Sequence, residues 1–297
     1  MDAAVPFEES VTLFIHIFIS LAMLCIGMSA TLREMGDSLL EREKLARVLA
    51  ANVLIPPILA LLIILVFPLP RPASIVLFLL AVAPGGINAV QFSTKAPGQT
   101  AAAGGLLVLL SLIGLVLAPA AAQIVLPIDA LERVAWGQLV VRIVGVIGVP
   151  LVIGILIRRF APEVARHVYK PAMLISTVSF IVSVVLSLGL RQDAAADLGV
   201  TTLAAMLTFI LALMALGWFL GGSDPEFRQV LAICTNLRNV GLVYLLVDAC
   251  CFSPFYSASV LAFMALMVPC NLVLTIVCAV ARKRRARQAD VEPSTGA

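Results

Sequence analysis

Residues 231–242, LAICTNLRNVGL, place one arginine and several amide and hydroxyl side chains inside an apolar stretch. Arg238 stands between Asn236 and Asn239, and Thr235 precedes them. A guanidinium group binds a carboxylate or a sulfonate through two parallel hydrogen bonds, and neighbouring amides add single ones. A charge at mid-membrane depth costs several kcal/mol and is usually functional. If a membrane surrounds this segment, the guanidinium needs a partner, which could be helix C-terminal carbonyls, water or an anionic substrate.

A second polar segment, VAPGGINAVQFS, interrupts an earlier apolar stretch. Pro84, Gly85 and Gly86 are expected to break a helix there, because proline lacks a backbone donor and glycine is conformationally free. Asn88 and Gln91 follow the break. A kinked packing helix would explain this segment alone. Together, two interrupted spans in corresponding halves of a chain indicate the binding site of a secondary transporter.

The composition places these segments in a membrane. Of the 297 residues, 62% are hydrophobic and 12% are charged, whereas soluble domains are about half apolar and a quarter charged. Apolar runs of about 20 residues recur along the chain, each long enough to cross the hydrocarbon core. We predict an all-α integral membrane protein with nine transmembrane helices, at residues 9–31, 48–67, 74–94, 99–126, 136–158, 171–190, 197–220, 229–250 and 257–281.

Basic residues mark one side of the predicted bundle. Fifteen of the 20 lysine and arginine residues lie in the loops after the first, third, fifth and seventh spans or in the C-terminal tail. The positive-inside rule places this side, with the C-terminus, in the cytoplasm and the N-terminus outside the plasma (inner) membrane. The acidic N-terminus lacks the features of a cleaved signal peptide, so the first span is predicted to remain. Residues 282–297 are predicted to form a basic, disordered tail.

Other functional classes lack their usual signals. The net charge of +3 is small and comes mostly from loops and the tail, so no nucleic-acid partner is implied. The six cysteines show no metal-ligand spacing, and neither a metal nor another cofactor is predicted. The sequence has no paired aspartates within a span, no H-E-x-x-H motif and no serine–histidine arrangement. The protein is therefore not expected to be an enzyme.

The segment APGGINAVQFSTKAPGQTAAAGG resembles the bile acid:sodium symporter family. In that family Pro-Gly-Gly and a polar run stand at the break of one discontinuous helix. A Glu-x-Gly-Met-Gln-Asn run stands at the break of the other, and a His-Asn pair lies in the last helix. The counterparts here are residues 84–86, 234–239 and 270–271. The resemblance runs from GMSATLREMGDSL, after the first span, to the last span.

The resemblance implies an inverted-repeat transporter fold in its nine-helix form, with two discontinuous helices crossing near the membrane midplane. Residues 1–281 would form one transporter domain. Its core would comprise about 48–126 and 197–281, and its panel about 9–31 and 136–190, with substrate between core and panel. The implied substrate contacts are Arg238, Asn239 and Asn271, with Asn88, Gln91, Thr235 and Asn236 lining the crossing.

The sequence departs from the family at the positions that bind sodium. The five ligand positions of one sodium site are occupied here by Ala89, Val90, Ala103, Leu107 and Cys234. At the second site the glutamate is again Cys234, the glutamine is Arg238, and a glutamine on an earlier helix is Asn52. A hard cation requires several oxygen ligands, and a fixed guanidinium repels it. Sodium binding at either site is therefore doubtful.

Three roles are open for Arg238: replacement of the sodium charge, binding of a substrate anion, or capping of helix carbonyls. The favoured hypothesis is a sodium-independent secondary transporter of small organic anions in the lipid bilayer. A sodium-coupled symporter with unrecognised ligands and a non-transporting membrane sensor on the same scaffold are the alternatives. Steroid, keto acid, pantoate-like and sulfonate anions all fit the pattern, and direction and oligomeric state are not indicated.

Two further polar residues lie within predicted spans. His16 in the first span is the one titratable imidazole there, so proton coupling remains an option, although a lone histidine in a span is more often a packing group. Arg142 lies near the outer end of the fifth span and is expected to extend toward the outer surface.

Overall fold

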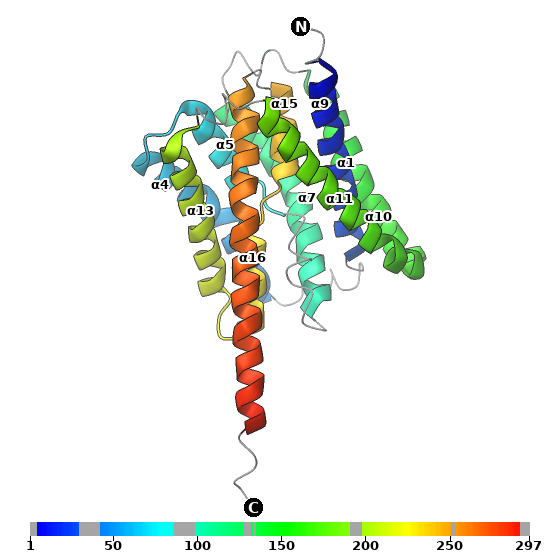
Figure 1. Ribbon diagram of the computed structural model, residues 1–297, viewed down its shortest axis with the longest axis vertical. Coiled ribbons are helices and arrows are strands. Elements are labelled where there is room, and N and C mark those ends of the chain that lie inside the picture. The colour runs from blue at the N-terminus through cyan, green and yellow to red at the C-terminus, as the bar shows by residue number, and fades with distance from the viewer. Residues whose placement is uncertain are drawn as a thin grey trace, which may run out of the picture.

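The protein, seen in a computed structural model, is a bundle of helices (Figure 1). The structure describes residues 5–29, 42–85, 99–126, 132, 135–190, 198–250 and 253–291. The helices in chain order are α1 (Val5–Ser29), α3 (Arg42–Leu49), η1 (Ala50–Leu54), α4 (Ile55–Val66), α5 (Arg71–Val82), α7 (Gln99–Val125), α9 (Trp136–Ile143), η2 (Val144–Gly148), α10 (Val149–Phe160), α11 (Pro162–Leu190), α13 (Gly199–Leu220), α14 (Pro225–Asn236), α15 (Val240–Cys250) and α16 (Pro254–Val291).

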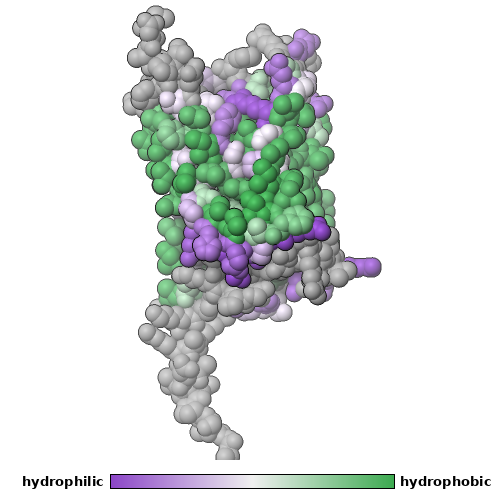
Figure 2. All heavy atoms as spheres, turned by 90° about the vertical axis from the view of Figure 1, so that its right-hand side faces the viewer, coloured by the Kyte–Doolittle hydropathy of each residue, from purple (hydrophilic) through white to green (hydrophobic). Residues whose placement is uncertain are grey.

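The surface of the bundle suits a lipid environment. Figure 2 shows a belt of hydrophobic side chains between two hydrophilic zones. Many large apolar side chains of the helices are exposed, and Leu65, Ile124 and Phe219 are each at least 75% exposed. In water such a surface would be strongly unfavourable, whereas hydrocarbon accepts it. The protein is therefore an integral, multi-pass membrane protein.

Seven helical segments of the described residues are long and apolar enough to cross a membrane, namely Ser10–Ser29, Arg42–Val66, Leu107–Val125, Trp136–Phe160, Pro162–Leu186, Gly199–Leu220 and Pro254–Ala281. Two further apolar helices, α5 and α15, are only 12 and 11 residues long. A helix of that length covers about half of a hydrocarbon core. Helix α5 overlaps the predicted third span and α15 lies within the predicted eighth, and the count of nine spans stays a prediction.

Two helices extend beyond their predicted limits. Helix α11 begins at Pro162 rather than near residue 171, because Pro162 fits the first turn of a helix and Glu163 favours its N-terminal end. Helix α16 continues to Val291, although the sequence predicts a disordered tail from residue 282. Arginine, lysine, alanine and glutamine are good helix formers, so they prolong a helix that the preceding span has already nucleated. Figure 1 shows this end of α16 projecting beyond the other helices.

The helices pack into two sets. We call α1, α9, η2, α10 and α11 the first helix group, in which α1 packs mainly against α10 and α11. The second helix group comprises α3, η1, α4, α5, α7 and α13 to α16, in which α13 packs against α14 and α16. Contacts of α1 with α7 and of α9 with α15 join the two groups. The second helix group contains Arg238, and the boundary between the two groups lies between α9 and α15 and between α1 and α7.

Helices α1 and α10 approach each other at a pair of glycines. A Cβ atom added to Gly27 would lie 2.9 Å from the Cα of Gly154 and would overlap the carbonyl oxygen of Leu151. The helix backbones can be this close only because neither glycine has a side chain, as is common between membrane helices. This contact fixes α1 against α10 within the first helix group.

We predict that Gly27→Ala destabilises the protein by about 1–3 kcal/mol, because the methyl group would force the two backbones apart. A lower melting temperature in detergent would report this effect. Gly145→Ala is the matched control, since nothing lies within 4 Å of a Cβ at Gly145. Equal melting temperatures for the two variants would contradict the prediction.

Candidate functional site

The polar segment around Arg238 is a break between two helices. Helix α14 ends at Asn236, and α15 begins at Val240. Leu237 between them is extended, with φ −74° and ψ 106°. The side-chain oxygen of Asn239 accepts a hydrogen bond from the backbone N–H of Leu242 at 3.1 Å, which caps the first turn of α15. The asparagine therefore has a structural role at this break.

The other polar segment meets this break directly. Helix α5 ends at Val82, and Pro84 pairs with Arg238 in an antiparallel backbone bridge. The backbone N–H of Asn239 donates to the carbonyl of Ala83 at 2.9 Å. Two segments predicted separately from the sequence thus cross in extended conformation, and backbone groups of one satisfy those of the other.

Gly85 allows this crossing to lie against helix α7. Its φ of 92° is in a region that side chains rarely adopt, and a Cβ here would lie 2.5 Å from the backbone nitrogen of Ser111. The Ser111 hydroxyl donates to the carbonyl of Gly85 at 3.5 Å. On the same helix, a Cβ at Gly114 would lie 2.7 Å from the carbonyl oxygen of Pro84. Small residues on both sides thus bring the break against α7.

The guanidinium of Arg238 is buried inside the second helix group. The residue is 2% exposed, and its Nη1 donates to the backbone carbonyl of Asn52 at 2.9 Å. Its Nε and Nη2 have no hydrogen-bond partner among the described residues. Since a buried cation is normally paired, two free donors on a buried guanidinium are energetically costly and can bind an anion.

The carbonyl of Asn52 is available because of two prolines. In an α-helix it would accept from residue 56, and in a π-helix, the conformation of η1, from residue 57. Both positions are proline and have no N–H, namely Pro56 and Pro57. Arg238 supplies the missing donor. This role of the prolines was not predicted from the sequence, although a Pro-Pro pair inside an apolar span signals a carbonyl without a helical donor.

Several other buried polar atoms occur at the break and on neighbouring helices. Thr235, Asn236, Asn239 and Asn271 are all fully buried. Atoms without a partner in the described part of the chain are Asn52 Oδ1, Thr235 Oγ1, Asn236 Nδ2 and Oδ1, Asn239 Nδ2 and Asn271 Oδ1. Such groups are rare in native proteins and usually have a reason. The amide of Asn271 donates to Met267 on its own helix, α16, at 2.9 Å.

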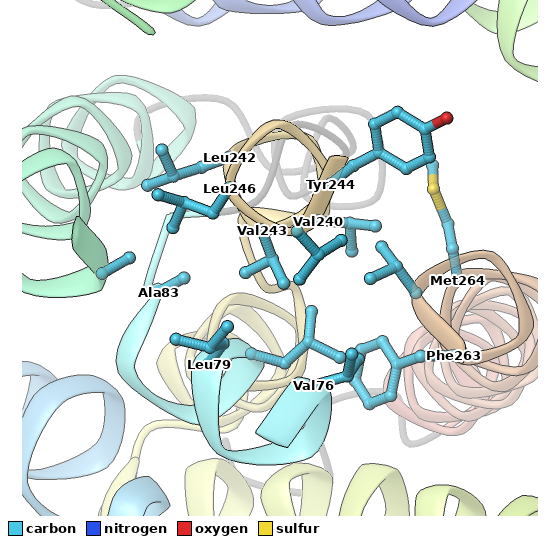
Figure 3. Packing of buried hydrophobic residues seen from close by; sticks show 14 of the residues in the cluster. Val76, Leu79, Ala83, Val240, Leu242, Val243, Tyr244, Leu246, Phe263 and Met264 are labelled. Atoms are coloured by element: carbon cyan, nitrogen blue, oxygen red, sulfur yellow. The ribbon is translucent and has the colours of Figure 1, made fainter. Parts of the chain in front are cut away.

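Apolar packing surrounds the crossing. Figure 3 shows Val76 and Leu79 of α5 facing Val240 and Val243 of α15. The same buried hydrophobic cluster includes Leu107 and Cys234. The family resemblance aligns both positions with sodium ligands. These two positions thus contribute apolar surface and a thiol, and neither offers an oxygen ligand.

Part of the predicted site lies outside the described residues. These positions are Gly86, Asn88, Ala89, Val90 and Gln91, and for Ala103 on α7 the side chain is also outside them. The structure therefore brings together Pro84, Gly85, Arg238, Asn239 and Asn52. It places Thr235 and Asn236 in the last turn of α14 and Asn271 on α16.

Arg142 contacts side chains on two other helices, and its predicted extension toward the outer surface stays a prediction. Its Nη2 lies 3.0 Å from Asp248 Oδ2 on α15, and both Nε and Nη2 lie within 3.3 Å of His16 Nε2 on α1. A carboxylate partner stabilises a partly buried guanidinium through a charge-assisted hydrogen bond. The pairing could not be read from the sequence, because Arg142 and Asp248 come from different helices.

Residues 16–197 match the model of the sodium bile acid symporter family, which is more than half of the chain. The chain belongs to this family. No curated protein matches the chain. Membership of the symporter family makes the protein a membrane transporter in its broad class and fits the expectation that it is not an enzyme.

The family match covers α1 to α11, including the break at Pro84. The break at Arg238 lies beyond the matched residues, so the contact between Pro84 and Arg238 connects the matched part of this symporter-family chain with the rest. A pocket of about 320 Å³ lies elsewhere, at the turn between α13 and α14, and includes none of the predicted site residues.

Proposed function

We propose that the protein is a sodium-independent secondary transporter of small organic anions, in which Arg238 provides the positive charge at the binding site. The observation that carries this proposal is the buried guanidinium at the crossing of two broken segments, with two donors free among the described residues. Helix breaks at membrane depth in secondary transporters contribute backbone and side-chain groups to substrate and ion sites.

The placement of Arg238 supports its role as a substitute for sodium. The guanidinium donates to the carbonyl of Asn52. According to the family resemblance, both residues occupy ligand positions of the second sodium site: Asn52 stands in place of one glutamine and Arg238 in place of another. A sodium ion about 4 Å from the guanidinium would be repelled by about 4 kcal/mol at an effective dielectric constant of 20. The arginine thus holds a permanent positive charge and excludes the ion.

The two helix groups support an alternating-access mechanism. The first helix group corresponds to the predicted panel, and the second helix group corresponds to the predicted core and contains both breaks. With the N-terminus outside, relative movement of the groups would expose the crossing to each side in turn. Because Arg238 is buried here, substrate would reach its two free donors only after such a movement.

Loss of sodium coupling has an energetic consequence. Moving a monoanion against an interior-negative potential costs about 2.3 kcal/mol per 100 mV. Without a coupled cation, the same field favours export of the anion or exchange of one anion for another. The transporter is therefore expected to work as an exporter or an exchanger, unless protons replace sodium.

Transport by the purified protein in liposomes tests the proposal. The probes are a radiolabelled bile acid, a 2-keto acid and a short sulfonate, each assayed with the same unlabelled anion inside. We expect counterflow of at least one probe at the same rate with external sodium or with N-methyl-D-glucamine. Empty liposomes and sodium titration at constant ionic strength are the controls. Strict dependence on a sodium gradient would contradict sodium independence, and the absence of counterflow for all anions would contradict transport.

A further inference from the structure

The cluster of His16, Arg142 and Asp248 lies where the two helix groups meet. His16 is on α1 and Arg142 on α9, both in the first helix group, whereas Asp248 is on α15 in the second. The ion pair of Arg142 with Asp248, 3.0 Å long, therefore joins the groups. Helices α9 and α15 lie toward the end of the molecule that carries the N-terminus, which is the predicted outer side (Figure 1).

Two other hydrogen bonds of α1 join helices of the first helix group only. The hydroxyl of Ser20 donates to Val146, and the hydroxyl of Ser176 donates to Phe18, at 3.1 and 3.0 Å. Both bonds stay within the first helix group. Such bonds would keep the first helix group together when it moves. The ion pair of Arg142 with Asp248 instead joins the first helix group to the second.

Close apolar packing lies behind the ion pair. A Cβ added to Gly241 on α15 would lie 2.7 Å from Cγ1 of Ile19 on α1. Ile19 is three residues from His16, and Gly241 is seven residues, or about two helical turns, from Asp248. Ile19 is fully buried. Helix α15 is thus held against the first helix group by the ion pair with α9 and, deeper in the molecule, by close apolar contact with α1.

We propose that the pair of Arg142 and Asp248 is a gate that keeps the outer ends of the two helix groups together. It opens when the groups separate, and His16 is a positioning residue that holds the guanidinium of Arg142 toward Asp248. The side chains of Arg142 and Asp248 are only 31% and 25% exposed. At this burial the pair is stronger than a surface ion pair, yet water can reach both charges once the contact separates.

The neutral imidazole suits this positioning role. Its Nε2 accepts a hydrogen bond from Arg142 at 3.0 Å, in the tautomer that carries its proton on Nδ1. The partly buried guanidinium then has two partners that restrict its rotamer. Helix α7, which packs against α1, has no ionisable residue, and those of α10 and α11 lie in residues 158–159 and 162–170. Arg142 and Asp248 are the charges that act on the imidazole.

The gate rests on the proposed transport function, but its test needs no transported solute. Ile19→Cys places a thiol behind the ion pair, and its alkylation by a membrane-impermeant maleimide in liposomes is followed by mass spectrometry. In this background we expect Arg142→Gln and Asp248→Asn each to increase the labelling rate on the order of tenfold. The double variant should show the same increase in labelling rate, since each substitution removes the same ion pair. Exchange of the charges, Arg142→Asp with Asp248→Arg, should restore protection.

Two comparisons distinguish a gate from a fold-supporting ion pair. Native Cys25 is buried within the first helix group and should stay unlabelled in every variant. His16→Gln retains an acceptor for Arg142 and should preserve protection of the Ile19→Cys thiol, whereas His16→Leu should weaken it. Unchanged labelling after both single substitutions of the ion pair would overturn the gate. So would parallel labelling of Cys25, which would mean that the pair supports the whole fold. Failure of transport with correct labelling would refute only the proposed function.

Discussion

Replacing Arg238 with methionine is expected to reduce organic-anion transport roughly 100-fold, which corresponds to the loss of one or two charge-assisted hydrogen bonds. The melting temperature is expected to stay the same or rise. In the folded protein the guanidinium makes one hydrogen bond, to Asn52, and leaves Nε and Nη2 without partners among the described residues. Its desolvation is not repaid by that bond, so an apolar side chain of similar length should be tolerated.

Counterflow in liposomes and thermal unfolding in detergent measure these two effects. Arg71→Met is the matched control, because Arg71 is exposed at the start of α5 and its loss should leave counterflow unchanged. Arg238→Lys keeps a charge but loses the forked donor geometry, so its transport rate should lie between those of the wild type and Arg238→Met. Normal transport with a lower melting temperature in Arg238→Met would mean that the arginine only caps the Asn52 carbonyl.

Substitution of Gly85 by alanine is expected to destabilise the protein by about 3 kcal/mol or more and to abolish transport. Two effects add at this residue. Its φ of 92° strains any side chain, and the new methyl group would lie 2.5–2.7 Å from the backbone and hydroxyl of Ser111. Since Pro84, next to Gly85, pairs with Arg238, displacement from α7 should also disturb the crossing.

Gly199→Ala separates the two contributions in the Gly85 experiment. Gly199 also has positive φ, 68°, but nothing lies within 4 Å of a Cβ there. Its substitution should therefore cost about 1 kcal/mol from backbone strain alone. Thermal unfolding of both variants gives the difference, which reports the steric overlap with α7. Equal melting temperatures would show that the Gly85 segment yields easily and that its contact with Ser111 is not tight.

The broad class and the positions of the breaks could be predicted from the sequence because they depend on local composition. Apolar runs of membrane length need no knowledge of neighbours, and a polar interruption is visible within a few residues. Residues 237–239 lie between α14 and α15, and α5 ends at Val82, two residues before the first position of the predicted break. The extension of α16 was less predictable, since helix continuation depends on the nucleus supplied by the preceding span.

The contacts of the candidate site depend on which helices pack together. Arg238 and Asn52 are 186 residues apart, and their hydrogen bond exists because the crossing brings the guanidinium to a carbonyl that Pro56 and Pro57 leave without a helical donor. The sequence shows the free carbonyl and the buried charge separately, but it does not show that one serves the other.

By itself, the sequence determined that this is a helical membrane protein of the symporter family type, interrupted twice by polar segments, with an arginine where the resemblance implies a sodium ligand. Only the tertiary structure decided that the two interruptions bridge at Pro84 and Arg238 and that Arg142 pairs with Asp248. The physical reason is that hydropathy and helix breaks are properties of neighbouring residues, whereas the partner of a buried charge is set by the packing of distant helices.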